Sequence, residues 1–174
     1  MKYKKSNKLI FKLVPLVILL AISFLYCLYN LNNNAVYYSR YTPHSKDKNP
    51  ELIMVVSHLD KIKLPFHKNY RVNLDGNPAL VLNKNYILQK NENKVELSDS
   101  KLFSDEGYIY YYSETGQYLY ATNNKTWKKD YSNIRKQEAM QTVSKIIDPI
   151  VKAQHKPKIN LQWLFDWKYK DRFQ

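Results

Sequence analysis

The sequence predicts an α+β protein: a curved antiparallel β-sheet covered on one face by two or three helices, preceded by a single N-terminal transmembrane helix. Three patterns predict this fold. An apolar run opens the chain, period-two segments separated by turn residues fill its middle, and apolar residues at helical spacing flank them. We divide the chain into a Lys-rich stub and anchor (1–31), a polar tether (32–49) and one α+β domain (50–174).

The apolar run Leu9–Leu31 is long enough to cross a bilayer as one helix. Lys12 lies one turn inside its start, where the side chain can snorkel to the lipid headgroups. Five lysines precede the uncharged part of the run: Lys2, Lys4, Lys5, Lys8 and Lys12. The positive-inside rule therefore predicts a single-pass membrane protein with a cytoplasmic N-terminus and an extracellular C-terminal domain.

A cleaved signal peptide is the alternative interpretation of this segment, with small residues at Ala21-Ile22-Ser23. The apolar run continues through Phe24–Tyr29, where a mature chain would be polar, so we favour an uncleaved anchor. The only cysteine, Cys27, lies in the run, and the predicted outer domain therefore has no internal disulfide.

The chain is strongly basic, with a formal net charge of +13. Removing the five N-terminal lysines leaves +8, spread thinly and without a block of like charges. This excess indicates either attraction to anionic lipids and wall polymers or a general bias towards Lys, Asn, Tyr and Ile. The predicted compartment argues against nucleic acid as a partner.

The first helix of the domain is expected from Pro50 to about Ile62. Asn49 provides an N-cap, Pro50 suits the first turn, and Glu51 complements the helix dipole. Leu64-Pro65 then ends the helix.

From Tyr70 onwards, short period-two segments alternate with turns such as Asp75-Gly76-Asn77-Pro78 and Thr115-Gly116-Gln117, which is typical of an antiparallel meander. The expected strands are Tyr70–Leu74, Ala79–Leu82, Tyr86–Lys90, Val95–Phe103 with an interruption at Ser98–Ser100, Tyr108–Glu114 and Tyr118–Asn123.

Tyrosines crowd the last two of these strands. We expect the smaller residues Ile109, Leu119 and Ala121 to face the helices. An open, tyrosine-rich sheet face then remains, and it is either ordinary cross-strand pairing or a binding surface. Its predicted partner-binding residues are Tyr108, Tyr110, Tyr112, Tyr118 and Tyr120.

Two elements are expected after the meander. A helix over about Asn133–Gln154 follows a cap at Asp130 or Ser132, with a kink or break at Pro149. Strict alternation over 159–170 then predicts a long strand that buries Trp163 and Trp167 against the helices. The partner-binding residues expected from its polar positions are Asn160, Gln162, Asp166 and Lys168.

Motifs for catalysis are missing from the sequence. The three glycines all lie in turns, so no Gly-rich phosphate loop or serine elbow is present. The four histidines match no metal-binding spacing. A carboxylate pair for glycan hydrolysis stays open by default, with Glu114, Asp130 and Asp166 as candidates. We expect no enzyme activity, catalytic residue, metal, cofactor or small-molecule substrate.

The carboxyl end carries a more specific pattern. The run KPKINLQWLF (Lys156–Phe165), with the preceding Ile147-Asp148-Pro149-Ile150 and Trp127-Lys128, resembles the closing segment of the TipC family of immunity proteins. This match covers roughly the last third of the chain, and the order of anchor, tether, sheet and helix is similar throughout.

The resemblance implies a protein held on the outer face of a Gram-positive cytoplasmic membrane, where it binds and blocks a toxin of the LXG class delivered by type VII secretion. The best-known target toxin of the family destroys lipid II. No catalytic residues carry over. The residues leave two alternatives beside this antitoxin: an accessory or sensor protein of an envelope complex that binds anionic wall polymer, and a hydrolase of wall glycan.

Overall fold

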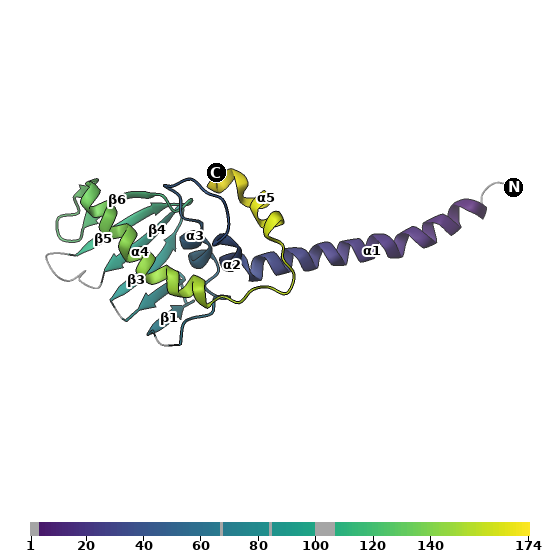
Figure 1. Cartoon of the computed structure of the whole chain (residues 1–174), viewed down its shortest axis with the longest axis horizontal. Coiled ribbons are helices and arrows are strands. Elements are labelled where there is room, and N and C mark those ends of the chain that lie inside the picture. The colour runs from purple at the N-terminus through teal and green to yellow at the C-terminus, as the bar shows by residue number, and fades with distance from the viewer. Residues whose placement is uncertain (1–3, 67, 84, 100–106) are drawn as a thin grey trace. The chain divides into compact units, whose positions relative to one another are not determined.

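The computed structural model describes residues 4–66, 68–83, 85–99 and 107–174. The chain forms two compact units, Met1–Asn33 and Asn34–Gln174 (Figure 1). The first unit consists of the long helix α1 (Lys4–Asn33), and the second holds all the strands and the remaining helices. The predicted α+β class, with an open antiparallel sheet and an N-terminal apolar helix, is confirmed.

Helix α1 contains a stretch that is long and apolar enough to cross a membrane. This stretch, Leu13–Asn33, has 21 residues and a mean hydropathy of 2.2. Most of its apolar side chains are exposed, with Leu19, Leu20 and Leu25 each more than 60% accessible. An apolar surface of this kind is stable only when lipid or protein covers it.

The second unit is built on one sheet in which every strand pairs with its sequence neighbour in antiparallel orientation. Its strands are β1 (Tyr70–Asn73), β2 (Ala79–Leu82), β3 (Tyr86–Asn91), β4 (Lys94–Asp99), β5 (Tyr108–Ser113), β6 (Tyr118–Asn123) and β7 (Lys129–Asp130). The predicted meander is confirmed for β1 to β6. Strand β7 was not among the predicted strands, and the end of the predicted Val95–Phe103 strand lies outside the described residues.

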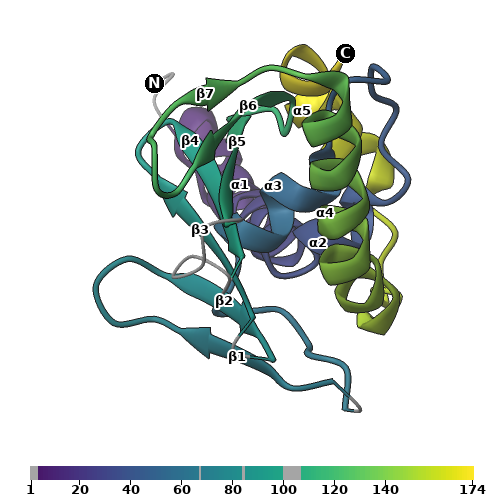
Figure 2. The ribbon, with the colours of Figure 1, turned by 90° about the vertical axis from the view of Figure 1, so that its left-hand side faces the viewer.

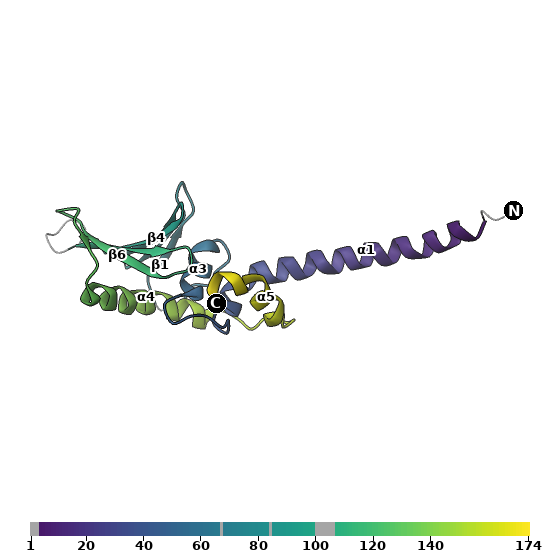
Figure 3. The ribbon, with the colours of Figure 1, turned by 90° about the horizontal axis from the view of Figure 1, so that it is seen from above.

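The helices of this unit lie on one side of the sheet (Figures 2 and 3). These are α2 (Ala35–Ser39), α3 (Pro50–Ser57), α4 (Asn133–Ala153) and α5 (Gln162–Phe173). Helices α3 and α4 pack directly on the strands, while α2 and α5 pack against each other. Among the described residues of this unit, no helix lies on the other side of the sheet, and we call that side the open face.

The core lies between the sheet and the helix layer. Cross-strand pairing aligns Leu80, Leu88, Leu97 and Tyr110 in one row that points to the helices, and all four are buried. Helices contribute further fully buried side chains: Leu52, Ile53, Ile146, Ile147, Ile150 and Phe165. Burial of these large apolar side chains is the main force that holds the helix layer to the sheet.

Helix α3 begins as predicted. The Asn49 side chain accepts a hydrogen bond from the Leu52 amide at 2.8 Å, and Pro50 occupies the first turn. The helix ends at Ser57 and not at the predicted Ile62. His58 leaves helical geometry at φ −133°, while Leu59 is buried outside the helix, so the apolar pattern continues past the helix end.

Helix α4 is capped by Ser132, whose hydroxyl accepts from the Arg135 amide at 3.3 Å. A kink or a break was expected at Pro149, and the break is ruled out, because the helix continues through this residue to Ala153. Ile147, Ile150 and Val151 are buried on both sides of the proline, and their packing outweighs the lost backbone hydrogen bond.

The predicted tether over 32–49 is corrected by the structure. Helix α2 begins at Ala35, and Tyr38 is completely buried. The Tyr38 hydroxyl donates to the Ile159 carbonyl at 2.9 Å and accepts from the Leu161 amide at 3.2 Å. A short segment with few apolar residues gives no visible periodicity, which is why the sequence pattern missed this element.

The predicted strand over 159–170 is wrong, because Gln162–Phe173 form helix α5. Leu161, Phe165 and Phe173 are buried, and they lie four or eight residues apart on one helix face. Trp163 and Trp167 form a second series four residues apart. Two such series offset by two residues imitate the period of a strand, and this coincidence misled the sequence analysis.

Candidate functional site

The β5–β6 hairpin carries the tyrosines that the sequence analysis singled out. Its register pairs Tyr110 with Ala121 and Tyr111 with Tyr120, then shifts so that Tyr112 pairs with Tyr118. The shift is a β-bulge that leaves Leu119 without a cross-strand partner. Tyr118 and Tyr120 therefore point to opposite faces of the sheet.

Four of the five tyrosines predicted for the open face lie on the covered side, so this part of the prediction is wrong. Tyr110 and Tyr112 are buried, with 8% and 2% of their surface exposed. The Tyr110 hydroxyl lies 3.5 Å from Glu138 Oε2 on α4. Tyr108 packs under the Arg135 guanidinium of α4 at 3.8 Å, and Tyr118 pairs with Tyr112.

Burial changes the acidity of these phenols. It raises the pKa of Tyr110 to about 12, with Glu138 adding to the shift, and raises the pKa of Tyr118 to about 12. It also raises the pKa of Tyr112 far above its ordinary range. All three therefore keep their hydroxyl protons at neutral pH and can act as hydrogen-bond donors.

Pairing with β4 explains why Tyr110 and Tyr112 face the helices and Tyr111 faces the open side. Alternation separates Tyr110 and Tyr112 from Tyr111, but it does not say which set is buried. Tyr112 pairs with Val95 and Tyr110 with Leu97, whereas Tyr111 pairs with Glu96. Because the polar neighbour lies beside Tyr111, the β4–β5 register assigns the faces, and neither strand alone reveals this register.

The open face instead gathers Tyr111 and Tyr120 with residues that were not predicted for it. The two rings stack at 4.8 Å, and Tyr131 packs against Tyr120 at 5.8 Å. Lys94 Nζ lies 5.6 Å from the Tyr120 ring and donates to its hydroxyl at 3.3 Å, while Lys129 Nζ lies 4.7 Å from the same ring. We call these five residues the aromatic–lysine cluster.

Polar groups border this cluster on the open face. Gln89 and Asn91 each donate to the Glu96 carboxylate, at 3.2 and 3.3 Å. Burial and the Glu96 charge raise the pKa of Tyr111, which keeps its hydroxyl protonated. Rigid aromatic rings with hydroxyl donors are groups that protein interfaces favour, and the ammonium and carboxylate groups around them suit the polar rim of an interface.

The polar residues near the C-terminus that were predicted to bind a partner do not lie on the open face. Gln162 donates to the Tyr38 carbonyl at 3.0 Å and to Asp166 at 2.9 Å, and Thr42 also donates to Asp166 at 2.9 Å. These contacts hold α5 to α2, so Gln162 and Asp166 serve the fold.

Asn160 and Lys168 likewise contact α5 itself. The Asn160 side chain accepts from the Gln162 amide at 3.0 Å, and Lys168 Nζ lies 5.2 Å from the Tyr169 ring. Since α5 belongs to the helix layer, the structure does not bring these residues to the open face.

Trp163 and Trp167, expected in the core, are 68% and 74% exposed. Their four-residue separation places both on one side of α5. This tryptophan pair is a second exposed aromatic surface, distinct from the open face of the sheet.

The carboxylates kept as default hydrolase candidates occupy different elements. Asp130 accepts from the Ser132 amide at 2.8 Å, and this bond together with Arg135 lowers the pKa of Asp130. Asp166 is held by Thr42 and Gln162, while Glu114 is exposed in the β5–β6 turn. Within the described parts of the chain, no group of three or more His, Cys, Asp or Glu side chains could hold a metal ion.

Comparison with known proteins adds no relative. No family model, no curated protein and no solved structure matches the chain. The resemblance of its C-terminal segment to TipC proteins therefore stays a prediction from sequence.

Proposed function

We propose that this protein is a membrane-tethered immunity protein whose folded domain binds and neutralises a secreted antibacterial toxin outside the cytoplasmic membrane. The apolar helix α1 supports the tether, because its exposed leucines require a lipid or protein environment. The resemblance of the C-terminal segment to TipC proteins suggests the kind of partner, a toxin exported by type VII secretion that in one case destroys lipid II.

The aromatic–lysine cluster is the observation that carries the proposal. Strands β4, β5, β6 and the end of β7 hold its side chains in place, and the stacked rings of Tyr111 and Tyr120 lose little entropy when a partner covers them. Tyrosine is one of the residues that most often dominates the binding energy of an interface. We therefore assign the toxin to the open face of the sheet.

The two lysines of the aromatic–lysine cluster favour an acidic partner. Lys94 and Lys129 both lie against the Tyr120 ring, so an acidic surface on the toxin would find two ammonium groups beside an aromatic platform. Such a basic face would speed association with an acidic partner at low salt.

The test is protection of a sensitive bacterium. Exported toxins encoded beside this protein would be expressed one at a time, with and without the full chain in the membrane. Growth should be restored against one toxin, and the purified toxin should form a complex with the full chain in lipid nanodiscs. Finding no neighbouring exported toxin that binds would reject the proposal.

A second candidate function is an accessory or sensor protein that binds anionic wall polymer. The two lysines of the aromatic–lysine cluster favour it, since tyrosine rings pack on sugars while ammonium groups attract phosphates. Polymer binding through these charges would weaken steeply as salt rises to physiological levels. A complex with a protein toxin that persists at that salt concentration would favour the immunity function.

A further inference from the structure

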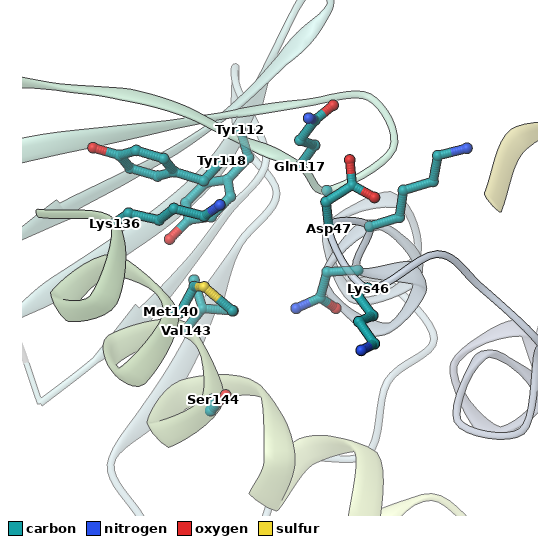
Figure 4. A pocket seen from close by; sticks show the side chains of 12 residues that line it. Lys46, Asp47, Tyr112, Gln117, Tyr118, Lys136, Met140, Val143 and Ser144 are labelled. Carbon is teal, nitrogen blue, oxygen red and sulfur yellow. The ribbon is translucent and has the colours of Figure 1, made fainter. Parts of the chain in front are cut away.

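A pocket lies on the covered side of the sheet, away from the aromatic–lysine cluster. It has a cavity volume of 270 Å³, just below the roughly 300–1,000 Å³ of sites for drug-sized ligands. Strands β5 and β6 supply Tyr112 and Tyr118, α4 supplies Lys136, Met140 and Val143, and the segment before α3 closes the other side (Figure 4). The pocket suits a small molecule or one residue of a peptide.

Tyr112 gives this pocket an unusual property. Its side chain is 98% buried, and its hydroxyl is the one buried side-chain oxygen or nitrogen in the described residues that has no hydrogen-bond partner. Leaving such a group unpaired in a protein interior is destabilising, because the group has lost its hydrogen bonds to water. An unpaired hydroxyl in a pocket wall is therefore a group that a ligand can satisfy.

Two of the side chains that line the pocket with Tyr112 can move. Lys136 and Met140 are exposed on α4 and lie beside the two tyrosine rings (Figure 4). Both side chains are long and unbranched, so they change rotamer easily and can open a path to the hydroxyl. Tyr118 is less free, because its hydroxyl already donates to the Asp130 carbonyl at 3.4 Å.

The charged side chains that line the pocket favour an anionic ligand. Lys46, Lys48 and Lys136 outnumber the single carboxylate of Asp47, so the pocket favours a negative group. Lys48 already donates to the main-chain oxygen of Gln174 at 2.6 Å, which leaves Lys136 as the ammonium on the α4 side. Met140, Val143 and the tyrosine rings form an apolar wall below it.

We propose that this pocket binds a carboxylate carried on a short branched apolar body, with the Tyr112 hydroxyl donating to the carboxylate, Lys136 pairing with its charge, and Met140 and Val143 contacting the apolar body. Two sources can supply this chemistry: a free branched-chain acid, or the C-terminal residue of a peptide. The site lies on the covered side of the sheet, so it does not depend on toxin binding at the open face.

The experiment follows methyl NMR signals of Met140 and Val143 in the full chain in nanodiscs. The probes are 4-methylpentanoate and its neutral isostere 4-methylpentanamide, titrated separately. We expect saturable shifts with the acid at a Kd on the order of 1 mM, as suits so small a ligand. The amide should bind at least about tenfold more weakly, because it lacks the charge that strengthens each hydrogen bond.

Three variants locate the contact. Tyr112→Phe should weaken acid binding roughly tenfold or more, yet leave the unliganded domain as stable or slightly more stable, because it removes an unpaired buried hydroxyl. Lys136→Gln should weaken binding of the acid and leave binding of the amide unchanged. Lys145→Gln, an exposed lysine on the same helix outside the pocket, is the matched control and should change neither.

A peptide arm separates the two sources. Acetyl-Gly-Gly-Leu with a free carboxylate that binds more tightly than 4-methylpentanoate would identify a peptide C-terminus, and the reverse order would identify a free acid. The proposal is overturned if neither probe shifts the Met140 and Val143 signals. It is also overturned if Tyr112→Phe binds the acid as well as the natural chain does.

Discussion

Tyr111 and Tyr112 are adjacent in β5 and have the same side chain, but they lie in two different environments. Tyr112 is buried under α4 with an unpaired hydroxyl, whereas Tyr111 stacks on Tyr120 at the open face beside Lys94. The covered side uses tyrosine as core and as pocket wall, and the open side holds it in the aromatic–lysine cluster. Environment, and not residue type, decides which tyrosines stabilise the fold and which can meet a partner.

Replacing each of these tyrosines with alanine is the strongest way to break the comparison. Tyr112→Ala removes a buried ring and should cost about 3–5 kcal/mol of unfolding free energy. Tyr111→Ala removes a half-buried ring from a surface stack and should cost about 1 kcal/mol. Urea unfolding of the full chain in nanodiscs, followed by near-UV circular dichroism of the buried tyrosines, measures both; equal losses would show that the two sides do not differ.

The turn between β5 and β6 tests how the hairpin is held against the helix layer. Gly116 has φ +81°, and a Cβ there would lie 2.5 Å from the Asn49 carbonyl oxygen at the start of α3. Gly116→Ala combines this clash with backbone strain and should cost more than about 3 kcal/mol.

Gly76→Ala is the matched control for this prediction. Gly76 also has a positive φ, of +68°, but nothing lies within 4 Å of the added Cβ. Gly76→Ala should lower the unfolding free energy by only about 1–2 kcal/mol, which is the cost of left-handed backbone strain alone. If both glycine variants unfold at the same urea concentration, the turn does not pack against α3 as described.

Alkaline pH should lower the stability of the domain through the tyrosines on the covered side of the sheet. The pKa of Tyr110 is raised to about 12 and so is that of Tyr118, while an exposed tyrosine ionises near pH 10. The folded state therefore resists ionisation, so the stability these groups contribute is complete below pH 10 and is lost as pH rises towards 12. Tyr110→Phe should reduce the slope of stability against pH in this range; an unchanged slope would place the Tyr110 hydroxyl in water.

Acid pH should have a smaller effect on stability, through His58 at the C-terminal end of α3. Burial lowers the pKa of His58, whose Nδ1 lies 2.9 Å from the Met54 carbonyl oxygen. The neutral imidazole is favoured in the folded state, so its contribution is present above pH 6.5 and is lost as pH falls below it. Thermal unfolding between pH 7.5 and 5.5, compared with His58→Gln, measures this; a variant with the same pH dependence as the natural chain would contradict it.

The same comparison shows what sequence patterns could and could not predict. The meander was predictable because turn residues and period-two runs are local signals, and Asn49-Pro50 marked the start of α3 correctly. The side of the sheet that each tyrosine faces was not, because it depends on the β4–β5 register and on the bulge at Leu119. Both are properties of strand pairing that no single strand reveals.

Helix α5 illustrates a different limit. The buried Leu161 and Phe165 and the exposed Trp163 and Trp167 are all large and apolar, so the sequence showed one alternating row instead of two helix faces. Tyr38 and helix α2 were missed because a five-residue helix carries no period. The aromatic–lysine cluster was only partly predictable, since Lys94, Lys129 and Tyr131 join Tyr120 through tertiary contacts.

The central claim is that the open face of the sheet binds the toxin, and growth protection by the full chain tests it most directly. We compare a Lys94→Gln/Tyr120→Ala chain with a Trp163→Ala/Trp167→Ala chain, which changes the other exposed aromatic surface, after confirming equal amounts of folded protein in the membrane. The proposal predicts that the first chain loses protection by at least tenfold in tolerated toxin and that the second keeps it. Full protection by the first chain, or loss only in the second, would contradict it.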